Sequence, residues 1–192
     1  MSQRHDLFAA VAFAAIGLLA NAALVPANAM EKTVNVGGAP MYPSKNIIQN
    51  AVNSKDHTTL VAAVKAAGLV DTLQGAGPFT VFAPTNAAFG KLPAGTVDNL
   101  VKPENKATLS KILTYHVVPG RLTAAALMRS VKEGGGTAHF KTVEGEDLMV
   151  KQAGPGKLSV TDTKGDVSWI TIADVLQSNG VIHVVDTVLL PM

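Results

Sequence analysis

Histidine, tyrosine and carboxylate side chains are the reactive groups of this 192-residue chain, which contains no cysteine. Histidine can serve as a general base or a metal ligand, and a metal site needs several ligands at matched spacing. Four histidines fall on separate predicted elements, with no pair at ligand spacing: His57, His116, His139 and His183. The motifs of serine hydrolases, zinc proteases and phosphate-binding loops are absent. We therefore expect no catalytic residue, no metal site and no cofactor.

Tyr115 and His116 stand side by side where a helix is predicted to run into a strand. Two valines follow them, and a histidine in such an apolar strand is typical of the protein interior. The pattern favours a structural role, with the Tyr115 hydroxyl bonded to backbone and His116 neutral and hydrogen-bonded. His183 lies between Val181 and Val185 in another apolar strand, so a structural role is favoured there too.

Three carboxylates gather in one predicted turn at Glu144, Glu146 and Asp147. Calcium needs six or more oxygen ligands, so a solvated hairpin tip is favoured over a calcium site. Asp174 precedes an apolar pair and is predicted to cap a short turn. Asp186 follows a strand, where a structural role is again favoured.

The net charge is only +2, and the lysines are spread along the chain among carboxylates. No basic stripe with interleaved aromatic residues is present, so nucleic-acid binding is not expected. With 47% hydrophobic residues the chain is globular, and about 150 residues suffice for one domain with its own core. We expect a monomer.

The first 29 residues are typical of a signal peptide. Arg4 and His5 precede an apolar run over 7–20, and Ala27-Asn28-Ala29 is a small-x-small cleavage site. An uncleaved membrane anchor is the alternative, because the apolar run is almost long enough to span a bilayer. The chain has no cysteine and no Asn-x-Ser/Thr sequon, which fits an exported bacterial protein in the periplasm, in the medium or at the surface.

The stretch 78–89 is the predicted centre of the fold. A β-branched and aromatic strand over 79–82 stops at Pro84, and Thr85 is a predicted N-cap for a helix through Phe89. Further helices are predicted at 46–53, at 58–67 with Asp56 as cap and Gly68 as terminator, at 96–101 with Thr96 as cap, from 103 onward, and at 123–129 with Thr123 as cap.

Strands are predicted at 139–143, 148–152, 158–163, 168–172 and 181–185. The last of these is apolar on both faces and reads as a central strand. Helices come mostly first and strands mostly later, which indicates an α+β fold. Residues 30–42 are rich in glycine and proline and are predicted to be a flexible lead-in.

Three stretches, in this order, resemble the landmark motifs of the fasciclin (FAS1) domain family: Thr-Val-Phe-Ala-Pro-Thr-Asn-Ala-Ala-Phe at 80–89, Tyr-His-Val-Val-Pro-Gly at 115–120, and Asn-Gly-Val-Ile-His-Val-Val-Asp-Thr-Val-Leu-Leu-Pro at 179–191. The resemblance covers 43–192 and is to the single-domain secreted bacterial type. It implies a twisted two-sheet β core, a sandwich or wedge, packed against several short helices. It also implies adhesion by contact with an extracellular or cell-surface protein or matrix component. Tyr115 and His116 are the candidate interaction residues, because this dipeptide is associated with adhesion in the family.

The sequence departs from the family pattern at Asn86, where an acidic residue is common, and at Trp169, where a small residue is usual. Large aromatic residues in strands are mostly buried, so core packing is favoured for Trp169, with an exposed contact anchor as the alternative. The competing functional class is an extracytoplasmic ligand-binding or hydrolytic protein on the same fold. A deep apolar pocket with converging polar groups would favour that class, and an exposed apolar patch would favour adhesion.

Overall fold

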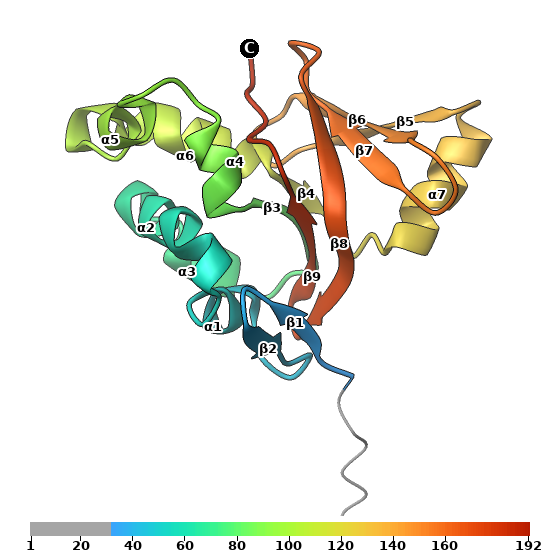
Figure 1. Ribbon diagram of the computed structural model, residues 1–192, viewed down its shortest axis with the longest axis horizontal. Coiled ribbons are helices and arrows are strands. Elements are labelled where there is room, and N and C mark those ends of the chain that lie inside the picture. Colours follow the sequence, from blue (N-terminus) through green and yellow to red (C-terminus); the bar gives the residue numbers. More distant parts are fainter. Residues whose placement is uncertain (1–31) are drawn as a thin grey trace, which may run out of the picture.

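The structure, a computed structural model, describes residues 32–192, so the predicted signal peptide lies outside the described residues. A curved sheet runs through the middle, with helices α1 to α6 on one side and α7 on the other (Figure 1). The helices are α1 Ile47–Ala51, α2 Thr58–Ala67, α3 Val70–Gln74, α4 Asn86–Gly90, α5 Thr96–Leu100, α6 Lys106–Tyr115 and α7 Ala124–Glu133, with 3₁₀ turns at Lys55–His57 and Pro103–Asn105. The strands are β1 Val34–Val36, β2 Ala39–Met41, β3 Phe79–Pro84, β4 Val117–Pro119, β5 Thr137–Lys141, β6 Asp147–Gln152, β7 Leu158–Thr161, β8 Val167–Gln177 and β9 Gly180–Val185. Within this part of the chain, no helix has both the length and the apolar character that a membrane span requires.

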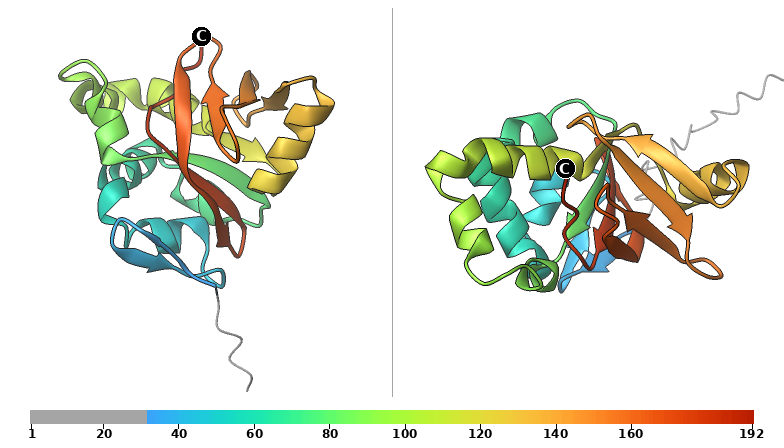
Figure 2. Two further views of the ribbon diagram at one scale, coloured as in Figure 1. Left: turned by 45° about the vertical axis from the view of Figure 1, so that its right-hand side comes forward. Right: turned by 90° about the horizontal axis from the view of Figure 1, so that it is seen from above.

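Seven of these strands form one sheet in the order β4-β3-β9-β8-β7-β6-β5. Only the β3–β9 pair is parallel. The sheet almost closes, because the N–H of Val143, just beyond β5, donates to the carbonyl of Val117 in β4 at 2.8 Å. The predicted α+β fold is confirmed, and its two sheets are halves of one sheet. The long strand β8 joins them, pairing with β7 through its first residues and with β9 after Trp169 (Figure 2).

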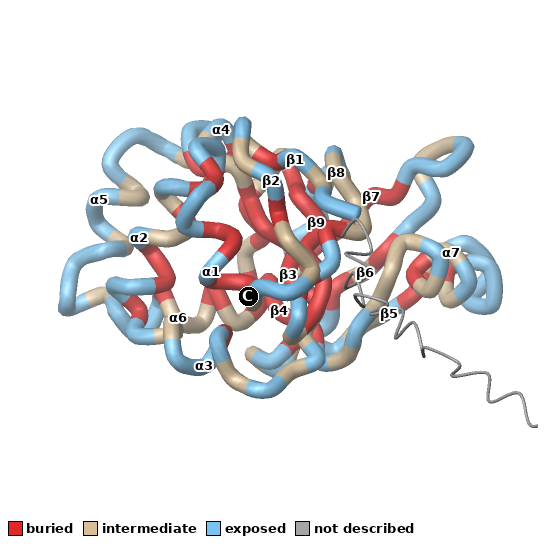
Figure 3. Tube along the Cα trace, turned by 90° about the horizontal axis from the view of Figure 1, so that it is seen from below, coloured by how far each residue is buried: buried red, intermediate tan, exposed pale blue. Residues whose placement is uncertain are grey.

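The predicted central strand is confirmed, since every residue of β9 is buried between β3 and β8 (Figure 3). The first residue of β9 has to be glycine, because a Cβ on Gly180 would lie 2.1 Å from the carbonyl oxygen of Phe79. The preceding Asn179 fastens the helices to this strand. Its amide oxygen accepts from the N–H of Ile47 at 3.0 Å, and its amide nitrogen donates to the carbonyls of Leu73 and Gly75. The Asn-Gly motif therefore links the helical side of the molecule to the sheet.

The core consists of two hydrophobic clusters, one on each side of the sheet. Successive residues of β3 feed alternate clusters, because side chains in a strand point to opposite faces. Val81 and Ala83 belong to the cluster beneath α1, α2 and α6, whereas Phe82 belongs to the cluster beneath α7. Both clusters therefore depend on β3.

The corner between β3 and α4 forms as predicted. The Thr85 hydroxyl accepts from the N–H of Ala88 at 3.2 Å, which satisfies a backbone donor that the first helical turn leaves free. The N–H of Thr85 itself donates to the carbonyl of Val185 at the end of β9, at 3.2 Å. This bond ties the corner to the C-terminal strand.

Thr85→Ala is expected to lower the free energy of unfolding by about 1 kcal/mol, because it removes the N-cap bond of α4. Thr96→Ala is the matched control. The sequence predicts Thr96 as the cap of α5, and this prediction is wrong: Gly95 occupies the N-cap position, and no side chain caps that helix. Urea unfolding of both variants measures the difference, and equal midpoints would contradict the capping role of Thr85.

The predicted flexible lead-in, residues 30–42, is wrong for its described part. β1 and β2 form an antiparallel hairpin in which Val36 and Met41 are almost fully buried. Glycine and proline signalled a loop, but the two glycines form the tight turn, with Gly37 and Gly38 at φ 59° and 77°. The apolar residues at the hairpin ends pack on the helical side of the core.

The predicted cap of α2 is also wrong. Asp56 lies in the 3₁₀ turn that leads into α2, and Asn86 from α4 supplies the bond instead. Its amide oxygen accepts from the N–H of Thr59 at 3.0 Å, while its amide nitrogen donates to the carbonyl of Lys55 at 2.8 Å. A carboxylate accepts but cannot donate, so asparagine makes a pair of bonds here that an acidic residue could not.

Candidate functional site

The Tyr115 side chain is wholly buried at the C-terminal end of α6. Its hydroxyl donates to the carbonyl of Asp147 at 3.1 Å and accepts from the N–H of Thr163 at 3.1 Å. Burial raises the pKa of this phenol above its ordinary value. Tyr115 thus joins α6 to β6 and to the turn after β7.

His116 is 2% exposed and uses both ring nitrogens. Nδ1 contacts the carbonyl of Ile112 at 2.8 Å, and the N–H of Leu189 donates to Nε2 at 3.0 Å. A neutral imidazole has one donor and one acceptor, so this pattern assigns the proton to Nδ1. Burial lowers the pKa of His116 to about 4, against a weaker pull upward from the Ile112 carbonyl. These contacts are those of a structural residue, which is the role that the two valines after His116 indicate.

His183 has an equivalent structural setting on the other side of the sheet. Its Nε2 contacts the carbonyl of Leu122 at 2.7 Å, the N–H of Asp174 donates to Nδ1 at 3.3 Å, and its ring stacks on Phe82 at 5.7 Å between centroids. Burial lowers the pKa of His183. Asp174 does not cap a short turn as predicted. It sits in a bulge of β8 at φ 57°, and its carboxylate accepts from the N–H of Ala124 at the start of α7.

The acidic turn is tied down by hydrogen bonds and a lysine. Lys111 lies 3.6 Å from the Glu144 carboxylate and 3.4 Å from that of Glu146. Glu146 also accepts from the N–H of Met192 at 3.0 Å, and this bond is the main reason why the pKa of its carboxyl is lowered. Nowhere in residues 32–192 do three histidine, aspartate or glutamate side chains gather as a metal site would require. The four histidines named above remain on separate elements.

The outer face of β8 differs from these interior groups, because it exposes large apolar side chains. Val167 and Trp169 are each 45% exposed, and Thr171 continues the row. We call these three residues the Trp169 face. Core packing, the favoured prediction for Trp169, is therefore wrong. Ser168 takes the inward position instead, because its hydroxyl donates to the carbonyl of Thr187 at 2.8 Å and accepts from the N–H of Thr187 at 3.0 Å.

The backbone of Trp169 is fixed by Asp186. The carboxylate of Asp186 accepts from the N–H of Trp169 at 2.9 Å, and the N–H of Asp186 donates to the Trp169 carbonyl at 3.2 Å. Burial alone would raise the pKa of Asp186, but bonds from Trp169, Thr187 and Lys91 lower it overall. The Asp186 carboxylate is therefore charged at neutral pH, and it holds the tryptophan on a rigid strand.

A groove of about 520 Å³ lies beside the indole, where β8 separates from β7. Its walls come from β8, from the start of β7 and from the N-terminus of α7, and include Trp169, Thr171, Ala173, Lys157, Leu158 and Ala124. The walls are mixed apolar and polar, with one lysine at the rim. The groove therefore lies next to an exposed aromatic ring.

The Fasciclin domain model matches residues 55–191 of this sequence. The chain belongs to the fasciclin domain family.

This fasciclin domain is similar to proteins of bacteria and animals. It is 48% identical over 163 residues to "Protein sll1483" of Synechocystis sp., covering 84% of this chain and 82% of that protein. It is 38% identical over 146 residues to the "Cell surface glycolipoprotein MPB83" of Mycobacterium bovis, covering 73% of this chain and 58% of that protein. A solved FAS1 domain pair from the insect cell adhesion molecule fasciclin I has the same fold, with a TM-score of 0.68 at 20% identity. That match covers 78% of this chain and 52% of the pair, so this fasciclin domain spans about half of that structure.

Tyr115 and His116, the candidate interaction residues, are buried, whereas Trp169, which the sequence assigned to the core, is exposed. One signal for the exposed tryptophan was present. Ser168 and Trp169 are neighbours in a strand, so their side chains point to opposite faces and only one of them can face inward. Hydropathy favours Trp169 for the inward position. Ser168 takes that position instead, because its hydroxyl bonds to the backbone of Thr187, nineteen residues away. Burial of His57 was likewise not predicted.

Proposed function

We propose that this fasciclin domain is an exported, non-catalytic binding module that contacts an extracellular or cell-surface protein through the Trp169 face. The observation that carries the proposal is the indole of Trp169, 45% exposed on a rigid strand beside a groove. Tryptophan is enriched among the residues that contribute most to protein interfaces, because it buries a large area at low entropic cost. Val167 extends the exposed apolar surface beside the indole, and contiguous exposed apolar surface marks interaction sites.

The hydrogen bonds of the buried histidines support a non-catalytic role. Catalytic histidines need a free ring nitrogen within reach of a substrate, and both nitrogens of His116 and His183 already bond to backbone groups. The name of the mycobacterial relative, a cell surface glycolipoprotein, supports export. The insect protein of the same fold is named as a cell adhesion molecule, which supports a role in adhesion. A partner protein or matrix component is thus the kind of ligand that we propose for this chain.

Trp169→Ala is expected to weaken binding of the purified mature domain to the cell-surface fraction of its own source at least about tenfold, the effect of a moderate interface hot spot. Val101→Ala is the matched control, because Val101 is also an exposed apolar residue but lies beyond α5 on the helical side. Surface plasmon resonance with immobilised fraction measures both. Binding of Trp169→Ala that equals wild type would refute the proposal, provided that its unfolding midpoint is unchanged.

A further inference from the structure

The Trp169 face continues across the outer face of strands β5 to β8. Helix α7 covers the opposite face of these strands, where Leu127 and Val131 pack on the apolar side chains of β6 and β7 (Figure 1). Side chains alternate along a strand, so the residues between those apolar positions point outward. The strand registers align Trp169 with three outward side chains across the sheet, in the order Ser159, Lys151 and Thr137.

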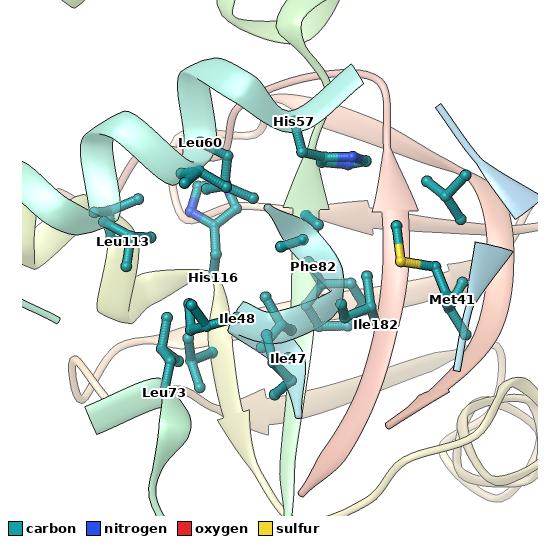
Figure 4. A pocket seen from close by; sticks show the side chains of 18 residues that line it. Met41, Ile47, Ile48, His57, Leu60, Leu73, Phe82, Leu113, His116 and Ile182 are labelled. Atoms are coloured by element: carbon teal, nitrogen blue, oxygen red, sulfur yellow. The ribbon is translucent and has the colours of Figure 1, made fainter. Parts of the chain in front are cut away.

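The cavity beneath the β1–β2 hairpin is not an alternative binding site. It measures only about 40 Å³, and apolar side chains such as Met41, Ile47 and Leu60 converge on it (Figure 4). Since a single water molecule needs roughly 10–15 Å³, a space of this size belongs to the core. The groove beside Trp169, in contrast, measures about 520 Å³ and opens to the surface. A side chain of a partner therefore has room in the groove and not in the cavity.

Two lysines near the indole have no carboxylate partner. Lys157 lines the groove together with Trp169, and Lys151 lies two strands away from Trp169, roughly 10 Å at the usual strand spacing. In the part of the chain that the structure describes, every ion pair involves Lys91 or Lys111. The charges of Lys151 and Lys157 are therefore not neutralised by an ion pair within residues 32–192.

The carboxylates on strands β5 to β9 and their turns do not offset these two charges. Most of them are bound by lysines or by backbone N–H groups: Glu144, Glu146, Asp162, Asp174 and Asp186. The other two are exposed, and each has a lysine of its own nearby. Asp147 stands opposite Lys141 in the β5–β6 register, and Asp166 shares the β7–β8 turn with Lys164. The surplus positive charge of this surface therefore lies beside the indole.

We infer that the partner of the Trp169 face is a protein that presents an acidic segment, in which carboxylates flank an apolar side chain. The apolar side chain enters the groove against the indole, and the carboxylates pair with Lys157 and Lys151. Opposite charges across an interface accelerate association and select the partner, because they attract before contact is made. This inference rests on the proposed function and adds the chemistry of the bound protein segment.

The charge around the indole can be measured without a partner, because Trp169 is the single tryptophan of the chain. Iodide, an anion, is expected to quench its fluorescence more efficiently in wild type than in the double variant Lys151→Glu/Lys157→Glu. Caesium, a cation, is expected to show the reverse order. The matched control is Lys102→Glu/Lys106→Glu, the same change in net charge at exposed lysines around the start of α6, and it is expected to behave as wild type. Quenching that is the same in wild type and in Lys151→Glu/Lys157→Glu would overturn the inference.

The same two double variants test the partner, with the immobilised cell-surface fraction as the probe. Lys151→Glu/Lys157→Glu is expected to bind at least about tenfold more weakly than wild type, mainly through slower association, because charges at the rim of an interface act on the association rate. Lys102→Glu/Lys106→Glu is expected to bind as wild type does. Equal binding by the two double variants would overturn the inference.

Two further results separate this inference from the proposed function. If Trp169→Ala loses binding while Lys151→Glu/Lys157→Glu keeps it, the acidic character of the partner is refuted and the Trp169 face is not. Protease digestion of the cell-surface fraction is expected to abolish binding of the wild-type domain. Binding that persists after digestion would identify an anionic polysaccharide as the partner and would overturn the acidic protein segment.

Discussion

Phe82→Ala is expected to lower the free energy of unfolding by about 3–5 kcal/mol, the cost of deleting a large aromatic side chain from a protein core. Phe82 is fully buried in β3, next to the central strand, and its ring stacks on that of His183. It belongs to the same cluster as Tyr115 and Leu189, so the void would open where β3, α6 and the C-terminal segment meet. Urea unfolding followed by circular dichroism measures the loss.

Phe140→Ala is the matched control for this prediction. Phe140 packs against the same cluster but is only partly buried, on β5 at the edge of the sheet. Its removal is expected to cost clearly less than that of Phe82. A Phe82→Ala midpoint equal to wild type, or a smaller loss than Phe140→Ala, would show that β3 is not the centre of the core.

Acidification is expected to destabilise the protein between pH 6.5 and 4, because His116 is held neutral in the fold. The unfolded chain takes up a proton near pH 6.5, whereas burial keeps the folded ring unprotonated down to about pH 4. The stability from this residue is therefore complete above pH 6.5 and is lost as the pH falls toward 4. Linkage puts the loss from His116 at about 2.5 kcal/mol between pH 7.5 and 4.5. Burial of His57 and His183 shifts their pKa values in the same direction and adds to the effect.

His116→Gln isolates the contribution of this one residue. Glutamine can accept from the N–H of Leu189 without titrating, so the variant is expected to lose about 2.5 kcal/mol less than wild type over the same pH interval. The comparison uses the pH dependence of each protein's own unfolding free energy, so a lower starting stability of the variant does not matter. Parallel pH profiles for the two proteins would contradict the burial of a neutral His116.

Local sequence signals predicted much of the fold. Thr85 and Thr123 cap their helices as expected, and Gly68 ends α2 in the left-handed conformation. In each case the bonding partner lies within a few residues, so type and spacing are sufficient information. The burial of strand 181–185 could likewise be predicted, because apolar residues on both faces leave no solvent side.

The features that sequence reasoning missed depend on distant partners. Asn86 caps a helix that begins 28 residues earlier, and Ser168 faces inward because its hydroxyl meets the backbone of Thr187. The burial of His57 results from packing by several elements that are distant in the sequence. No local pattern encodes such contacts. The candidate interaction pair Tyr115 and His116 could be placed in the interior from sequence, but the Trp169 face could not be found.

Cell-surface binding by Trp169→Ala and by His116→Gln, compared at neutral pH where both folds should be intact, tests the Trp169 face most directly. Trp169→Ala is expected to lose binding while His116→Gln retains it, because the first residue is exposed and the second lies inside the core. Binding that survives in Trp169→Ala but is lost in a folded His116→Gln would contradict the role of the Trp169 face.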